Sequence, residues 1–162
     1  MAGYTPACDN LLHSAEGRNL KDVHLAVGIA VLAANLLAGI WGGIAWARHE
    51  PSVWFWYVLR AAQTVVVVQV TLGLVLLATD HKAGQELHYL YGISPLVVTL
   101  VTEAMRAGAA QRELEDVDDL AALSPDEQRA LARRVLLREM GVMTIGALLI
   151  TTLALRAATT GA

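Results

Sequence analysis

Two histidines occur in matched surroundings whose residue types and spacing suit the binding of a metal centre. The stretch around His24 aligns with the stretch around His88, so that the pattern acid-x-His-x-x-x-Gly-Ile occurs twice, 64 residues apart. Four residues separate each histidine from its glycine, Gly28 or Gly92, which places the two on one face of a helix. Because glycine has no side chain, it leaves room beside the imidazole for a flat group or a neighbouring helix.

The composition indicates that the helices carrying these histidines lie in a membrane. Of 162 residues, 56% are hydrophobic and 17% are charged, and the mean hydropathy is +0.48. A soluble domain of this size cannot bury that much apolar surface. The single cysteine, Cys8, excludes an intrachain disulfide framework, and the net charge of −3 excludes a broad basic surface for nucleic acid. We therefore expect the lipid bilayer, and not a nucleic acid, as the partner of this surface.

Hydropathy marks four stretches near the roughly 20 residues that a helix needs to cross the hydrocarbon core. They are residues 23–47, 58–79, 87–105 and 140–157. The sequence therefore predicts an all-α fold, a single integral membrane four-helix bundle over residues 1–162. Between the third and fourth spans, Ser124, Pro125 and Glu127 form a signature of a helix N-terminus, which predicts a cytoplasmic helical extension that continues into the fourth span.

The distribution of basic residues predicts the orientation of the bundle in the cell membrane. Four spans place both termini on one side. Of the twelve basic residues, eight flank the loop at 49–57 or lie in the segment 106–139, and four lie on the other side. Because cytoplasmic loops are enriched in Lys and Arg, we expect both termini outside. The aromatic residues around the first loop are predicted to form an interfacial belt: Trp41, Trp46, Trp54, Phe55, Trp56 and Tyr57.

Polar residues inside or near the spans extend the histidine pair to a candidate haem site. Facing histidines in a four-helix bundle commonly hold a haem, and two neutral imidazoles would fill both axial positions of its iron. Gln69, midway along the second span, is a candidate pocket donor or interhelical contact. Arg156, at the outer end of the fourth span, would pair with a haem propionate. Glu103 is expected to pair with a basic residue one turn on, Arg106.

The order of these residues resembles one half of the heme A synthase family. A histidine starts one helix, Gln69-Val70-Thr71-Leu72-Gly73 lies late in the returning helix, and His88 follows a short outer loop. The resemblance covers residues 20–105. It implies a four-helix unit whose histidine pair ligates a haem near the outer face, as a lone haem or in a homodimer. Leu25 stands where the family often has an arginine, so a relative that binds haem b is implied rather than an enzyme that makes heme A.

Two other functions fit the same residues. The histidines could be packing residues in a non-catalytic membrane subunit or assembly factor of a respiratory complex, docked through the Arg-rich extension. Alternatively, Asp80, His81 and Glu86 lie near His88 and, with His24, offer nitrogen and oxygen ligands for a divalent metal ion. Gly39 and Gly43 form a G-x-x-x-G pair that permits either a homodimer or close packing within the chain. The sequence leaves open whether the protein is an enzyme.

Overall fold

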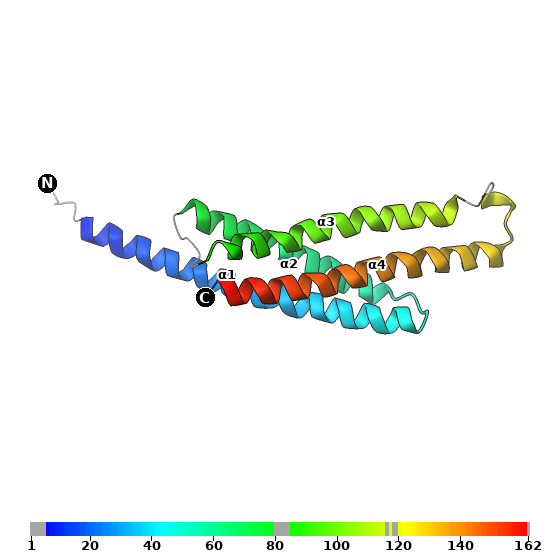
Figure 1. Ribbon diagram of the computed structural model, residues 1–162, viewed down its shortest axis with the longest axis horizontal. Helices are drawn as coiled ribbons and strands as arrows, with labels where there is room; N and C mark the ends of the chain where they lie inside the picture. Colours follow the sequence, from blue (N-terminus) through cyan, green and yellow to red (C-terminus); the bar gives the residue numbers. More distant parts are fainter. Residues whose placement is uncertain (1–5, 80–84, 116, 118–119, 162) are drawn as a thin grey trace.

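The computed structural model describes residues 6–79, 85–115, 117 and 120–161, with side chains from residue 19 onward except that of residue 121. This part of the chain forms α1 (Pro6–Ala47), α2 (Val53–Ala78), α3 (Leu87–Leu114), the short 3-10 helix η1 (Leu120–Ala122) and α4 (Pro125–Thr160) (Figure 1). Each of the four long helices is long and apolar enough to span a membrane. The prediction of an all-α, multi-pass membrane bundle is confirmed.

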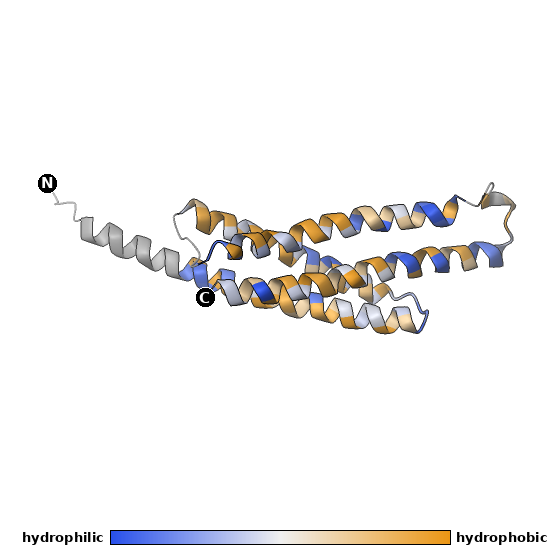
Figure 2. Ribbon diagram, viewed as in Figure 1, coloured by the Kyte–Doolittle hydropathy of each residue, from blue (hydrophilic) through white to orange (hydrophobic). Residues whose placement is uncertain are grey.

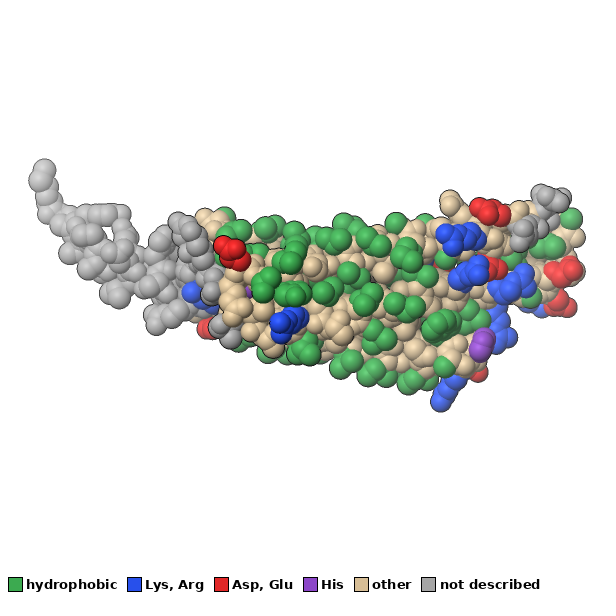
Figure 3. Space-filling model, in the orientation of Figure 1, with side chains coloured by type: hydrophobic (Ala, Val, Ile, Leu, Met, Phe, Trp, Pro, Cys, Tyr) green, Lys and Arg blue, Asp and Glu red, His purple; other side chains and the backbone are tan. Residues whose placement is uncertain are grey.

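The four long helices lie side by side in one elongated bundle (Figure 1). α4 packs mainly against α3 and α1, α2 packs mainly against α1, and α2 contacts α3 far less. Hydrophobic residues occupy the middle of the helices, while charged side chains gather toward the two ends of the bundle (Figures 2 and 3). We call the end that carries His24 and His88 the histidine end, and the opposite end, with the α1–α2 turn and the α3–α4 connection, the arginine end.

Local hydrogen bonds define the turn between α1 and α2. The amide of Glu50 donates to the carbonyl of Ala45 at 2.9 Å, and the amide of His49 donates to the carbonyl of Trp46 at 3.0 Å. His49 adopts a left-handed conformation with φ of 57°. These features form a Schellman motif, which ends α1. α2 then begins after Ser52, whose side chain accepts a hydrogen bond from the amide of Phe55.

The predicted start of the helical extension into the fourth span is confirmed. Ser124 caps α4, its side chain and that of Glu127 form a reciprocal capping box, and Pro125 occupies the first turn. No break separates this start from the membrane span, because α4 is continuous over 36 residues. At 1.5 Å per residue α4 is about 54 Å long. It is therefore longer than the hydrocarbon core of a bilayer, which is roughly 30 Å thick.

The core corrects the prediction of an aromatic belt. Phe55 is fully buried, and Trp56 stacks edge-on against it with ring centroids 5.2 Å apart. Phe55 belongs to a cluster of buried side chains from α1, α2 and α4, together with Ala38, Ala45, Leu59, Met140, Met143 and Ala147. The belt is therefore limited to the exposed rings, which are Trp41, Trp46, Trp54 and Tyr57. Phe55 turns inward because it lies on the face of α2 that packs against α1 and α4.

Two further features of α1 bear on the sequence predictions. The helix begins at Pro6, well before the start of the predicted span at residue 23. Gly39 packs within the chain, since a Cβ atom at this position would lie only 2.5 Å from Leu148 Cδ2 of α4. Close packing inside the bundle therefore accounts for Gly39 without a second copy of the chain.

Candidate functional site at the histidine end

The structure brings the two repeated histidines together. His24 lies near the point where α1 enters the bundle, and His88 lies in the first turn of α3. Their ring centroids are 6.2 Å apart with an interplanar angle of 64°. Two imidazoles that share one metal atom at about 2 Å from each nitrogen would have centroids roughly 6 Å apart. The observed separation therefore matches both a simple ring contact and a shared ligand.

α4 holds the ring of His88 in place. The Nδ1 atom of His88 lies 3.0 Å from the carbonyl oxygen of Ala157. A carbonyl can only accept, so Nδ1 carries the proton, and in the neutral ring Nε2 keeps its lone pair. Gly161 makes room for this contact, because a Cβ atom there would lie 2.6 Å from Nδ1. A backbone carbonyl on the far nitrogen is the usual way in which a ligating histidine is oriented.

α2 supplies the partner of His24. The amide nitrogen Nε2 of Gln69 lies 3.2 Å from Nε2 of His24, and the amide donates because it has no lone pair to offer. Among the described residues, the buried atoms His24 Nδ1 and Gln69 Oε1 have no hydrogen-bond partner. Two glycines keep this contact close: a Cβ at Gly28 would lie 3.1 Å from Gln69 Nε2, and one at Gly73 would lie 3.3 Å from His24 Cε1.

The two glycines of the repeat have different surroundings. Gly28 faces Gln69, whereas a Cβ atom at Gly92 would meet nothing within 4 Å among the described atoms. Gly92 lies three residues before Pro95 and four after His88, on the face of α3 that carries the buried residues Pro95 and Thr99. The position beside Gly92 is therefore open, one helical turn along α3 from His88.

Arg156 lies at the same end of the bundle. It directly precedes Ala157, whose carbonyl holds His88, and its guanidinium carbon is 5.9 Å from the centroid of the Tyr91 ring. The side chain is exposed, so it can reach an anion at the boundary between lipid and water. Of the sequence-predicted residues, His24, His88, Gln69, Gly28, Gly92 and Arg156 all lie at the histidine end.

The alternative metal site falls partly outside the described residues. Asp80 and His81 are not described, and Glu86 is the exposed residue at the start of α3. Within the described part of the chain, no group of three or more His, Cys, Asp or Glu side chains could hold a metal ion. Two imidazoles alone are too few for a structural zinc site, but they complete the coordination of an iron atom that a porphyrin already holds by four nitrogens.

Some residues of this region were not predicted from the sequence. The Ala157 carbonyl and Gly161 act through the backbone and carry no side-chain signal.

Asn35, in the middle of the first span, is also buried. Its amide donates to the carbonyl of Val31 at 2.9 Å, while its Oδ1 atom has no partner among the described residues. A polar residue in the middle of the first span is a signal that could have identified it.

A second polar cluster joins three helices at the arginine end. The carboxylate of Glu103 accepts hydrogen bonds from Arg60 at 2.5 Å, Gln63 at 2.8 Å and Arg106 at 2.9 Å. Arg106 also lies 3.4 Å from the carboxylate of Glu139 on α4. The predicted pairing of Glu103 with Arg106 is confirmed. This cluster, which we call the Glu103 bridge, ties α2 to α3 and α4 far from the histidine pair.

Comparisons of the chain with protein-family models, with curated proteins and with solved structures find no match.

Proposed function

We propose that the protein is a small membrane protein that binds one haem b between His24 and His88 and acts in electron transfer or haem handling. The observation that carries this proposal is the approach of the two rings to 6.2 Å from separate helices. Neither ring belongs to a larger group of metal ligands in the described part of the chain, so a cofactor that needs two axial nitrogens fits best.

The surrounding residues fit the group. His88 would present its free Nε2, because Ala157 holds its Nδ1 atom. His24 would bind through Nε2, the nitrogen that accepts the hydrogen bond from Gln69 in the haem-free chain, so the Gln69 amide would have to turn away. The open position beside Gly92 offers room for a flat ring. Arg156 would pair with a propionate at the membrane surface. The bound haem would supply one-electron chemistry at its iron, and the protein would supply orientation and an apolar environment.

Absorption spectroscopy of purified, full-length protein after haem-replete expression tests this proposal. We expect a Soret band and a split low-spin α/β pattern, with the pattern lost in His24→Ala and in His88→Ala. His49→Asn is the matched control, because His49 lies at the opposite end of the bundle and asparagine tolerates its left-handed backbone. Colourless wild-type protein, or an unchanged spectrum in both alanine variants, would refute the proposal.

The proposed site is on the outer leaflet of the cell membrane, with both termini outside. The excess of basic residues at the arginine end supports this orientation. Cys8 is the only cysteine, so a membrane-impermeant thiol reagent applied to intact cells reports the side of the N-terminus. Labelling that appears only after the cells are lysed would place the termini inside.

A second candidate function is a non-catalytic membrane subunit or assembly factor. It is favoured by a hollow of about 730 Å³ in the connection between α3 and α4, lined by Leu114, Leu120, Gln128, Leu131, Ala132, Val135 and Leu136. An apolar hollow outside the most hydrophobic stretches suits a protein partner. A colourless protein that co-purifies in a stoichiometric membrane complex would favour this function over haem binding.

A further inference from the structure

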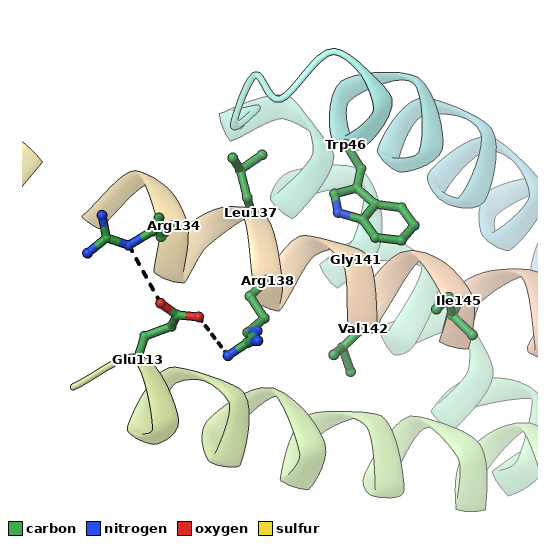
Figure 4. A pocket seen from close by; sticks show the side chains of 8 residues that line it. All are labelled: Trp46, Glu113, Arg134, Leu137, Arg138, Gly141, Val142 and Ile145. Carbon is green, nitrogen blue, oxygen red and sulfur yellow. Dashed lines mark ion pairs between the residues drawn. The ribbon is translucent and has the colours of Figure 1, made fainter. Parts of the chain in front are cut away.

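A hollow of about 400 Å³ opens on the face of α4 at the arginine end (Figure 4). Trp46 of α1 and Glu113 of α3 border it, and the face of α4 from Arg134 to Ile145 forms its floor. The hollow lies away from the histidine pair, so the haem proposal does not use it.

One end of the hollow is positively charged. Nη1 of Arg138 lies 2.6 Å from one oxygen of Glu113, and Nε of Arg134 lies 3.7 Å from the other. Figure 4 shows the carboxylate between the two guanidinium groups. Two positive groups around one carboxylate leave an excess positive charge. Each guanidinium has five N–H donors, and the Arg134 and Arg138 side chains are 61% and 54% exposed, so donors remain available to a further anion.

The other end of the hollow is apolar. Val142 and Ile145 follow Arg138 along α4, and the indole of Trp46 lies over Gly141, where a Cβ atom would be 3.0 Å from its Cε2 atom. The missing side chain at Gly141 therefore keeps the floor low beside the indole. From Arg134 to Ile145 the helix rises about 16 Å, close to half of the roughly 30 Å hydrocarbon thickness.

We propose that this hollow binds one anionic phospholipid. Its phosphate would lie on Arg134 and Arg138, and one acyl chain would follow Val142 and Ile145 beside Trp46. The order of the lining, charged and then apolar along the membrane axis, matches the order of groups in a phospholipid. An anionic headgroup is favoured over a zwitterionic one, because the cation of the latter would face the excess positive charge. Basic pockets between spans on the cytoplasmic side bind such headgroups in other membrane proteins.

Native mass spectrometry of the detergent-purified full chain, with added phosphatidylglycerol or phosphatidylcholine of equal chain length, tests this proposal. We expect one retained phosphatidylglycerol and weaker retention of phosphatidylcholine. Arg138→Gln should lower retention of phosphatidylglycerol about fivefold, the effect of one charge near an anionic surface. Glu113→Gln should raise it by a similar factor, because it removes the competing carboxylate. A purely structural ion pair would make both variants act in the same direction.

Two further variants distinguish specific lipid binding from misfolding and from unspecific binding. Val142→Trp leaves every charge in place but fills the hollow, so we expect it to lose the retained lipid. Arg129→Gln, on the same helix but outside the hollow and paired with Asp126, should retain lipid as the wild type does. Equal losses in Arg129→Gln and Arg138→Gln, or lowered retention in Glu113→Gln, would overturn the proposal. Displacement of the lipid by equimolar glycerol phosphate would also overturn it, since the site would then bind a free anion.

Discussion

Substitutions at Gly92 give the most informative test of the proposed haem site. Gly28 and Gly92 are equivalent in the sequence repeat, but only Gly92 has nothing within 4 Å of an added Cβ atom among the described atoms. Alanine is more favourable than glycine in a helix by about 1 kcal/mol. Gly92→Ala should therefore raise the free energy of unfolding of the haem-free protein by nearly that amount.

Gly28→Ala should behave differently. The added methyl group would lie 3.1 Å from the amide nitrogen of Gln69, so that side chain must move and its hydrogen bond to His24 weakens. The loss of one such bond costs about 1 kcal/mol, which offsets the gain in helix propensity and leaves the stability nearly unchanged. Unfolding in mixed micelles with increasing dodecyl sulfate, followed by circular dichroism, measures both variants.

A larger side chain at Gly92 tests the space proposed for the porphyrin separately from the stability of the haem-free protein. Gly92→Phe should leave the haem-free protein folded but occupy the room proposed for the porphyrin. We expect its haem affinity, measured by Soret titration, to fall at least tenfold, which corresponds to about 1.4 kcal/mol. Wild-type affinity in Gly92→Phe would refute this reasoning, as would a Gly92→Ala protein less stable than the wild type.

Three predictions concern the fold. Glu103→Gln removes the charge from the Glu103 bridge while its Arg partners remain, so the free energy of unfolding should fall by about 2 kcal/mol after allowance for partial exposure, whereas exposed Glu115→Gln should change it by less than about 0.5 kcal/mol. Ser124→Ala removes the cap of α4 and should weaken its first turn by about 1 kcal/mol, seen as roughly fivefold faster amide exchange there with unchanged exchange at the histidine end. Gly39→Leu should lower the free energy of unfolding by about 1–3 kcal/mol through overlap with α4. A Gly39→Leu protein that is as stable as the wild type but monomeric, where the wild type is a dimer, would contradict this.

The membrane spans could be predicted from the sequence because hydropathy and helix signals act locally. The cap at Ser124 and the end of α1 at Ala47 both follow from nearby residues. The inward turn of Phe55 could not be predicted in this way, because it depends on which face of α2 meets α1 and α4. The residues next to Phe55 in the sequence do not indicate which helices its side chain contacts.

The same distinction applies to the candidate site, where some features follow from the sequence repeat and others only from the packing of the helices. The repeat indicated that His24 and His88 enter the bundle from one end, since two spans with one intervening helix run in the same direction. It did not distinguish Gly28 from Gly92, whose surroundings differ because Gln69 approaches only the first. The carbonyl of Ala157 could not be found at all, because every residue has a carbonyl and only the packing of α4 selects this one.

The length of α4 has a consequence at the arginine end. The guanidinium group of Arg133 donates to the carbonyl of His49 at 2.8 Å and 3.2 Å, which fixes the level of the α1–α2 turn along α4. The residues from Pro125 to Ala132 lie beyond that level (Figure 1) and project by about 12 Å at 1.5 Å per residue. The headgroup layer on one side of a bilayer is only about 5–8 Å thick. With the α1–α2 turn at the edge of the hydrocarbon, the tip formed by η1 and the start of α4 would therefore stand in the aqueous phase, where a water-soluble protein can meet it without touching lipid.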